Sequence, residues 1–306
     1  MITLDISCFE TYEQYLQGLR DFFGGGNQRP ESNATKTMPA GEARARRVGA
    51  ASPGNSRRII RRTIGDRFRD FDKAPEMLVV PGGEVLMGAS EGDRERLPFE
   101  LPPHAEQIAP FAVGIYPVTF AEWDAAVEAG AVRWKPPDNG WGRACMPIVN
   151  VSWDDVQDYL AWLGEQSGVA YRLLSEAEFE YLARAGSNAP WPWGQNAQPK
   201  LDENAWYSGN AGGRAQQVGK KLPNSLGFHD LLGNVDEWMA DAWRPDYRAH
   251  PGDGLPVQSG VGSQTFRVVR GGSWLDSPRA LRVSARNRQP PTHRSYRVGF
   301  RVARDV

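Results

Sequence analysis

A chain of 306 residues with 40% hydrophobic residues can form one large domain or two small ones, each with a packed core. Its 33 glycines, 23 prolines and 11 tryptophans favour many turns around an aromatic core and disfavour a helical bundle. The two cysteines, Cys8 and Cys145, exclude a disulfide framework. One bridge between them is possible, but Cys8 lies in a region expected to be separate, so we expect two free thiols. The first ten residues lack the basic and apolar regions of a secretory signal, and no segment is long and apolar enough to span a membrane. We therefore expect a cytoplasmic protein.

The net charge of −1 conceals an uneven distribution. Between Arg267 and Arg304 the chain carries ten arginines and one acidic residue, Asp276. Such a stretch could form a basic patch for nucleic acid, or its arginines could alternate along strands and pair with the acidic middle of the chain. We favour pairing within the domain.

Aromatic and leucine side chains recur every three or four residues between Phe9 and Phe23, which predicts an amphipathic helix over residues 1–25. Its apolar face would dock on the main domain or on a partner. Residues 26–75 are expected to be a disordered linker that contains a short basic helix over residues 57–72, with Ile60, Ile64, Phe68 and Phe71 on one face. A membrane surface, a nucleic acid or the acidic flank of the domain itself could receive this helix.

The folded body is expected to start at residue 76. Two apolar segments around Pro81-Gly82-Gly83 predict a hairpin over residues 77–88. Three capping boxes predict helices, because each pairs a hydroxyl side chain with a carboxylate three residues later. These pairs are Thr119 with Glu122, Ser152 with Asp155 and Ser175 with Glu178, and Gly130, Gly164 and Gly186 are expected to end the helices. A few helices followed by a loop-rich antiparallel region indicate an α+β fold.

Seven ordered blocks resemble the formylglycine-generating enzyme, or sulfatase-modifying factor, superfamily. They are Val79–Gly88, Tyr116–Thr119, Pro147–Trp153, Tyr171–Tyr181, Gly233–Trp238, Arg270–Trp274 and Gly299–Arg301. The resemblance implies a C-type-lectin-like fold over roughly residues 76–304, with a few helices and short antiparallel strands. We accordingly expect one domain of this type over residues 76–306.

The redox metal sites of this superfamily are not expected here. The resemblance places the two copper-binding cysteines of the founding enzymes on Asp276 and Leu281. Leucine cannot ligate a metal, and one carboxylate is a poor ligand for copper(I), which prefers thiolates. A second branch binds iron through clustered histidines, whereas the four histidines here, at 104, 229, 250 and 293, show no such spacing. We expect each histidine to be hydrogen-bonded or solvated, and neither copper nor iron to be bound.

The resemblance does imply a structural calcium ion at the Gly233–Trp238 turn. Asp230 and Glu237 would supply side-chain oxygens, and Gly233 and Val235 backbone carbonyls, a set of hard ligands that suits Ca²⁺. Alternatively, Asp230 caps a turn and Glu237 pairs with a C-terminal arginine. A second calcium site would use Asn204 and the carbonyl of Ala205.

The leading hypothesis is a binding module whose protein or peptide ligand contacts the surface after the Gly-Gly-Ser-Trp motif. The candidate contact residues are Trp274, Leu275, Asp276, Ser277, Arg279, Ala280, Arg286, Arg288, Gln289, His293, Tyr296 and Arg297. Arg270, Arg282 and Arg301 are instead expected to be buried partners of acidic residues. The variable proteins of diversity-generating retroelements resemble this chain and diversify the same segment, so a diversified region is one version of the hypothesis. The alternative is a diverged metal-dependent oxidoreductase, for example with a metal at Asp276 and His293.

Overall fold

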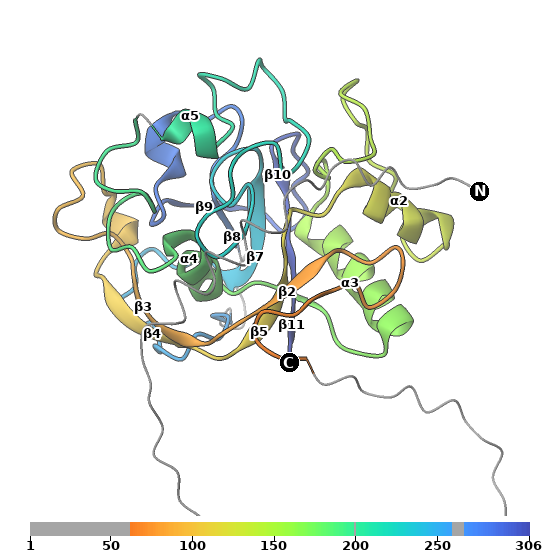
Figure 1. Ribbon diagram of the computed structural model, residues 1–306, viewed down its shortest axis with the longest axis horizontal. Helices are drawn as coiled ribbons and strands as arrows, with labels where there is room; N and C mark the ends of the chain where they lie inside the picture. The colour runs from red at the N-terminus through yellow and green to blue at the C-terminus, as the bar shows by residue number, and fades with distance from the viewer. Residues whose placement is uncertain (1–61, 199, 259–265) are drawn as a thin grey trace, which may run out of the picture.

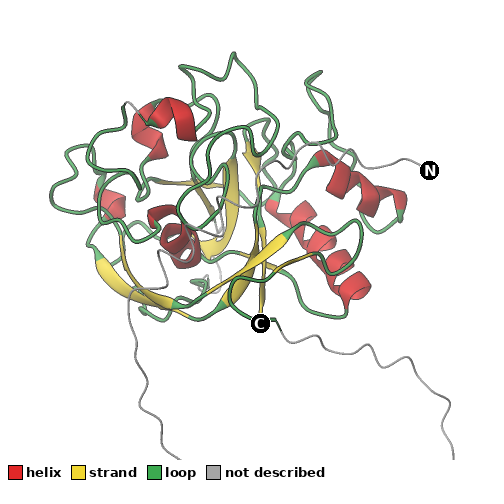
Figure 2. Cartoon of the chain, viewed as in Figure 1, coloured by secondary structure: helices red, strands yellow, loops and turns green. Residues whose placement is uncertain are grey.

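The computed structural model describes residues 62–198, 200–258 and 266–306. The helix predicted over residues 1–25 and most of the predicted linker lie outside the described residues. The described chain folds as an α+β domain in which loops join short strands and a few helices (Figure 2). None of the helices in the described ranges has the length and apolar character to cross a membrane.

A five-stranded antiparallel sheet forms the centre of the domain. Its strand order is β1 (Arg67–Phe68), β2 (Met77–Val80), β5 (Phe111–Gly114), β11 (Val302–Asp305) and β6 (Arg172–Leu173). The strand nearest the C-terminus thus lies between two strands from the first two thirds of the chain.

Both faces of this sheet are buried. All four residues of β2 are buried, and successive side chains on a strand point to opposite faces. Met77 and Val79 pack in one core with α2 (Phe120–Glu128) and α3 (Trp153–Ser167). Leu78 and Val80 pack in a second core with α4 (Glu176–Arg184). Figure 1 shows α2 and α3 on one side of the sheet and α4 on the other.

Two further sheets complete the domain. One has the order β10 (Val298–Gly299), β7 (Asp236–Ala242), β8 (Arg267–Arg270) and β9 (Arg286–Gln289), with β10 parallel to β7. The other pairs β3 (Gly83–Met87) with β4 (His104–Ile108). Helix α4 packs against both sheets, so it joins them in the second core. The shorter helices are α5 (Leu201–Asn204) and the 3₁₀ turns η2 (Pro98–Glu100) and η3 (Pro278–Leu281).

All three predicted capping boxes are present at the N-termini of α2, α3 and α4. Helix α2 ends at Glu128 and α4 at Arg184, each two residues before the glycine expected to stop it. Helix α3 continues past Gly164 and ends at Gly168, whose φ of 79° is the left-handed conformation that favours glycine. Gly164 was therefore the wrong stop signal.

Two sequence predictions near the start of the domain are wrong. The segments around Pro81-Gly82-Gly83 do not form a hairpin, because β2 pairs with β1 and β5 whereas β3 pairs with β4. The described part of the predicted basic helix, residues 62–72, contains strand β1 instead. Arg67 and Phe68 pair with Leu78 and Met77, so tertiary strand pairing overrides the helical spacing of the apolar residues. The ordered domain thus begins before residue 76.

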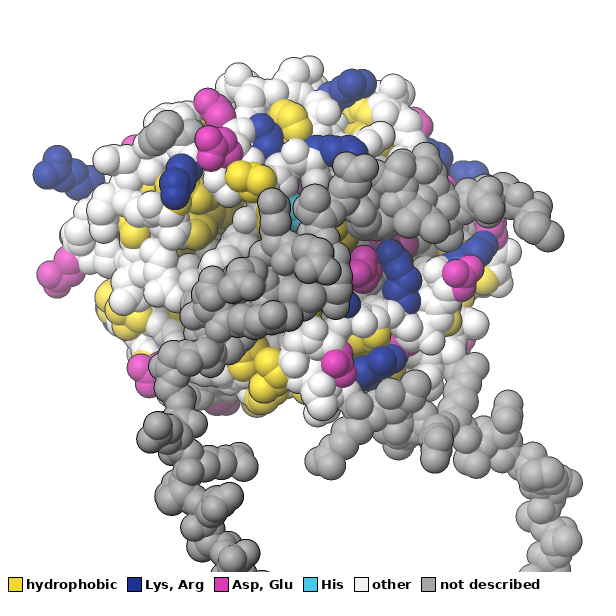
Figure 3. All heavy atoms as spheres, in the orientation of Figure 1, with side chains coloured by type: hydrophobic (Ala, Val, Ile, Leu, Met, Phe, Trp, Pro, Cys, Tyr) yellow, Lys and Arg dark blue, Asp and Glu magenta, His cyan; other side chains and the backbone are white. Residues whose placement is uncertain are grey.

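The cysteine and charge predictions had different outcomes. Cys145 is disulfide-bonded, so the expectation of two free thiols is wrong; Cys8 lies outside the described residues. Most C-terminal arginines do pair with acidic residues of the domain, as favoured above: Arg270, Arg282, Arg286, Arg294, Arg297, Arg301 and Arg304. On the face drawn in Figure 3, basic and acidic side chains of the described residues are interspersed.

Candidate functional site

The Gly-Gly-Ser-Trp turn follows strand β8 and requires both glycines. Gly271 has φ of 97°, and a Cβ there would lie 2.7 Å from the carbonyl oxygen of Leu231. Gly272 has φ of 70°, and its Cβ would lie 2.9 Å from the carbonyl oxygen of Ala280. Positive φ and close backbone contacts both select glycine. The turn therefore folds the segment from Ser273 to Ala285 back over the sheet.

Asp276 stabilises this turn. Its Oδ2 accepts hydrogen bonds from the backbone N–H of Ser273 at 2.9 Å and from the Ser273 hydroxyl at 2.6 Å. Leu281, the other position that the resemblance aligns with a copper-binding cysteine, is fully buried in the second core. One position thus holds a turn-forming carboxylate, and the other an aliphatic core side chain.

A cavity of about 280 Å³ lies beneath the returning segment. Six of the twelve candidate contact residues line it: Asp276, Ser277, Arg279, Ala280, Arg286 and Arg297. Asp236, at the start of β7, also lines the cavity, although it is distant in sequence from these candidates. Glu100 and the two turn glycines line it as well. The cavity is therefore formed by both polar and apolar groups of η2, β7, β8, β9 and the segment after the turn.

Among the groups that line the cavity, the Asp236 carboxyl has a pKa far from its ordinary value. Burial, and then repulsion from Asp276, raise the pKa of its carboxyl to about 7. Arg297 lies between the two carboxylates, with Nη2 3.4 Å from Asp236 Oδ2 and 3.5 Å from Asp276 Oδ1. Asp236 can therefore gain or lose a proton near neutral pH while remaining inside the cavity.

Two arginines in the cavity wall, Arg270 and Arg282, are neutralised by buried acids. Arg270 pairs with Glu180 and Glu176, and Arg282 pairs with Asp93 and Glu100. These contacts, with the Arg301–Glu237 pair, confirm the structural role expected for Arg270, Arg282 and Arg301.

Arg286 was expected to bind ligand but is also a structural side chain. Its Nε lies 2.7 Å from Glu176 Oε1 and its Nη2 2.7 Å from Glu176 Oε2, and the side chain is 1% exposed. Arg279 is exposed, and its side chain makes one hydrogen bond within the described structure, from Nε to the Glu95 carbonyl at 3.3 Å. Arg279 and Arg297 are thus the cavity arginines that a ligand can reach.

The remaining candidates lie outside the cavity lining. Trp274 is only 6% exposed and packs against Trp141 and Tyr296. Leu275 and Tyr296 are 42% and 46% exposed, so they present apolar surface beside the cavity. Arg288 lies over the rings of Trp243 and Phe266, Gln289 ends β9, and His293 is exposed in the following turn.

The predicted calcium ligands lie close in sequence, but Glu237 is already paired. Both of its oxygens lie within 3.3 Å of the Arg301 guanidinium, and both side chains are fully buried. Asp230 Oδ2 accepts from the N–H of Gly219 at 2.8 Å, while its Oδ1 is buried without a hydrogen-bond partner among the described residues. A guanidinium at this distance competes with Ca²⁺ for Glu237, so the donor set fits calcium poorly. Calcium at this turn stays a prediction.

The second predicted calcium pair is engaged in local hydrogen bonds. Asn204 Nδ2 donates to the Lys200 carbonyl at 2.7 Å, and the Ala205 carbonyl accepts from Asn210 Nδ2 at 3.0 Å. These contacts close α5 and the loop that follows it.

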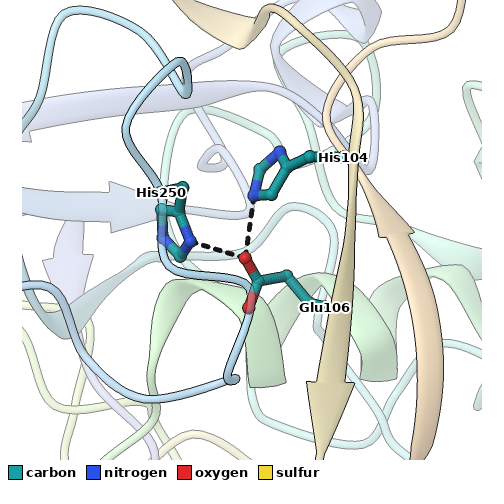
Figure 4. Close-up of side chains that lie close together, drawn as sticks. All are labelled: His104, Glu106 and His250. Atoms are coloured by element: carbon teal, nitrogen blue, oxygen red, sulfur yellow. Dashed lines mark ion pairs between the residues drawn. The ribbon is translucent and has the colours of Figure 1, made fainter.

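The structure also brings together three residues that sequence reasoning did not combine. His104 and His250 flank Glu106, with His104 Nε2 2.8 Å and His250 Nδ1 2.5 Å from Glu106 Oε1 (Figure 4). His104 and Glu106 are two residues apart on β4, a spacing that could have indicated one strand face. His250 comes from a loop distant in sequence, and no local pattern predicts that contact.

The arrangement of sheets and the glycine turn above the cavity define a domain of the formylglycine-generating-enzyme type. A family model described as "Sulfatase-modifying factor enzyme 1-like domain" matches residues 64–306. The chain therefore belongs to this family, which confirms the resemblance and the fold class expected from the sequence.

Individual relatives support the assignment. The chain is 28% identical to a formylglycine-generating enzyme of Thermomonospora curvata, over 77% of this chain and 98% of the relative. It is 29% identical to inactive C-alpha-formylglycine-generating enzyme 2 of Mus musculus, over 75% and 85%. Among solved structures it resembles PvdO from Pseudomonas aeruginosa, with a TM-score of 0.74, 34% identity and coverage of 80% of this chain and 100% of that one. Treponema denticola variable protein 1 shares the fold at a TM-score of 0.65 and 24% identity, covering 79% and 99%.

Proposed function

We propose that this domain is a recognition module that binds a protein or peptide ligand over the segment from Trp274 to Arg297. The observation that carries the proposal is the cavity beneath that segment, where Arg279 and Arg297 are accessible beside Asp236 and Asp276. The exposed Leu275 and Tyr296 supply apolar contact area next to it. Apolar anchors beside a few charged groups are typical of interface hot spots.

The cavity also indicates what part of a ligand would enter it. A volume of about 280 Å³ is at the small end of the range for ligand sites, so one polar side chain or a chain terminus fits better than a folded element. Arg279 and Arg297 favour an anionic group, because guanidinium groups bind carboxylates through paired hydrogen bonds. We therefore propose an acidic side chain or C-terminal carboxylate as the inserted group.

The residues at the two copper-ligand positions support recognition over copper-dependent oxidation. Asp276 uses Oδ2 to hold the turn, and Leu281 belongs to the core, so the pair lacks the soft thiolates that copper(I) prefers. Relatives of this family include a paralogue named as inactive as well as enzymes, so membership leaves both options open.

The test selects peptides from a displayed library on the full chain and measures their affinity for variants. Arg297→Gln should weaken binding at least ~10-fold, because it removes one charge-assisted contact of about 1.5–3 kcal/mol. Arg294→Gln is the matched control, since Arg294 lies in the same segment but pairs with Asp155 outside the cavity. In parallel, the copper-treated protein is incubated with a cysteinyl peptide. Conversion of that cysteine to an aldehyde would overturn the proposal.

A diverged oxidoreductase is the second candidate, and Asp236 favours it. A buried carboxyl whose pKa is raised to about 7 by burial and by Asp276 suits a general acid or base at neutral pH. Oxygen consumption with thiol substrates should then depend on Asp236 and be lost in Asp236→Asn. Absence of turnover in the wild-type protein leaves recognition as the only candidate of the two.

A diversified segment is the most specific version of the recognition proposal. Leu275, Ser277, His293 and Tyr296 are exposed, as diversified positions must be, whereas Trp274 is buried beneath them. This version requires a near-copy of the coding segment beside a reverse-transcriptase gene, with differences mainly at adenines. A genome that lacks such a copy excludes it.

A further inference from the structure

We propose that His104, Glu106 and His250 form a binding site for a divalent first-row transition metal ion. The site lies between strand β4 and the loop after β7, and it is separate from the recognition cavity. It is the one group of three or more metal-ligating side chains that converges within the described residues, and its ligand atoms all lie within 4.8 Å of one another.

The three side chains approach one another in the manner of metal ligands. His104 Nε2 and His250 Nδ1 lie 2.8 and 2.5 Å from Glu106 Oε1, but neither contact has the alignment of a hydrogen bond. All three atoms are buried and lack another hydrogen-bond partner among the described residues. Buried polar atoms without partners cost about 1–3 kcal/mol each, so an ion that satisfies all three at once would be strongly favoured.

In His104 and Glu106, the second polar atom of the side chain, which does not face the cluster, contacts the backbone. His104 Nδ1 lies 3.3 Å from the Pro102 carbonyl, which can only accept, so a neutral His104 ring held by this contact carries its proton on Nδ1 and its lone pair on Nε2. Glu106 Oε2 accepts from the N–H of Gly254 at 2.8 Å, which leaves Oε1 free. Such outer contacts orient the ligands in metal sites and select the nitrogen that binds.

The surrounding chain keeps the loop against the strand. The N–H of Gln107 donates to the carbonyl of Gly252 at 3.2 Å, and a Cβ on Gly254 would lie 2.4 Å from the Gln107 carbonyl oxygen. The ring of Tyr247 packs 4.9 Å from that of His104 and 5.8 Å from that of His250. His250 is thus delivered to β4 by a loop that cannot move away freely.

The donor set selects the class of ion. Two imidazoles and one carboxylate suit Zn²⁺, Fe²⁺ or Co²⁺ and not Ca²⁺, which requires more oxygen ligands. Metal bonds of about 2.0–2.2 Å place tetrahedral ligand atoms roughly 3.3 Å apart, so each histidine nitrogen needs to move away from Glu106 Oε1 by less than about 1 Å. The His104 side chain is 17% exposed, so the site lies close to the protein surface although its ligand atoms are buried.

Without a metal, the same residues would form a carboxylate shared by two imidazoles. In that state contacts with His104 and His250 outweigh the effect of burial and lower the pKa of Glu106 to about 2. The experiment must therefore separate an ion from a proton network.

The test uses the full chain without a histidine tag, after treatment with a chelator and dialysis. Equilibrium dialysis against Zn²⁺ should give one ion per chain. His250→Ala and Glu106→Gln should each weaken Zn²⁺ binding at least ~10-fold. Substituting a residue that only hydrogen-bonds a metal ligand already weakens binding by about 10-fold or more, and these two residues are ligands themselves. The side-chain amide introduced by Glu106→Gln can still accept from the N–H of Gly254, which keeps that loop contact. His293→Ala is the matched control, because His293 is exposed and outside the cluster, and it should bind Zn²⁺ as the wild type does.

A second measurement does not depend on whether the variants fold. X-ray absorption at the zinc edge of the wild-type protein should show two imidazole ligands, and excess Ca²⁺ should not displace the ion. No stoichiometric Zn²⁺, fewer than two imidazoles, or unchanged affinity in both variants would each overturn the metal site. Arg297→Gln should bind Zn²⁺ normally, so failure of the recognition proposal and failure of this one are distinguishable.

Discussion

Arg301 connects three parts of the chain through one buried guanidinium. It donates to the carbonyls of Gly114 at 2.9 Å and Ile115 at 2.6 Å, and to that of His229 at 2.8 Å. It also pairs with Glu237 at 2.9 Å. Strand β5, the turn before Gly233 and strand β7 therefore share one cation in the protein interior.

Replacing Arg301 should destabilise the domain strongly. Arg301→Met leaves Glu237 buried without its partner, and breaking a buried pair in this way typically costs about 3–5 kcal/mol. Arg294→Met breaks the exposed Arg294–Asp155 pair and should cost less than about 1 kcal/mol. The free energy of unfolding by urea measures both. Equal losses in the two variants would contradict the role given to Arg301.

Residue type alone did not distinguish structural from accessible arginines. Arg270, Arg282 and Arg301 were expected to be buried partners of acidic residues, and each forms such a pair. Arg286 lies in the same segment, and its partner Glu176 is 110 residues away, so no local signal revealed its burial. The contact between His104 and His250 was unpredictable for the same reason.

Among the elements, the glycine turn after β8 determines the shape of the cavity. A side chain at Gly272 would meet Ala280 and Leu281, both at 2.9 Å. The backbone at Gly272 therefore lies so close to Ala280 and Leu281 that only the hydrogen atoms of a glycine fit between them.

Gly272→Ala should be more destabilising than the same change at a glycine in open space. Gly213 has a comparable φ of 75°, but a Cβ there meets nothing within 4 Å. Gly213→Ala should cost about 1–2 kcal/mol from backbone strain alone. Gly272→Ala adds steric overlap of about 1–3 kcal/mol and should also reduce peptide binding at the cavity. Chemical denaturation and the binding assay above test this, and equal stability of the two variants would argue against the tight packing.

Local signals predicted elements well where the chain itself supplies the partner. Each capping box satisfies backbone N–H groups within four residues, so Thr119, Ser152 and Ser175 could be recognised without tertiary information. Strand β1 depends on pairing with β2, and the hairpin expected at Pro81 was replaced by pairing with β5 and β4. Pairing partners are chosen by the whole fold, which short patterns do not encode.

At the scale of the whole molecule, buried carboxyl groups determine how stability varies with pH. Burial is the main cause that raises the pKa of Asp230 to about 6, of Asp236 to about 7 and of Asp241 to about 8. An acid with a raised pKa keeps its proton longer in the folded state. Its contribution to stability is therefore lost as pH rises from its unfolded pKa of about 4 through the folded value.

Glu106 and His229 act in the opposite direction. The pKa of Glu106 is lowered to about 2 by its histidine contacts against the effect of burial, and burial lowers that of His229 to about 4. Each stabilising contribution is lost as pH falls through the interval between the unfolded and folded pKa values.

The thermal midpoint should consequently be highest near about pH 4 and should fall between about pH 4 and pH 8. Three acids act in that interval, and His229 opposes them only below its unfolded pKa of about 6.5. Calorimetry at constant ionic strength, with a chelator present, measures the profile, and Asp241→Asn should flatten its alkaline side. A midpoint that rises steadily from pH 5 to pH 8 would contradict these assignments.

Strand β11 has a consequence for how the chain is made. It separates β5 from β6 in the central sheet, yet it follows every other strand of the described residues in the order of synthesis. Strand β6 therefore cannot join the part of the sheet formed by β1, β2 and β5 until residues 302–305 have been synthesised. Until β11 is synthesised, the edges of β5 and β6 that it pairs with are unpaired, and unpaired strand edges are sites of aggregation.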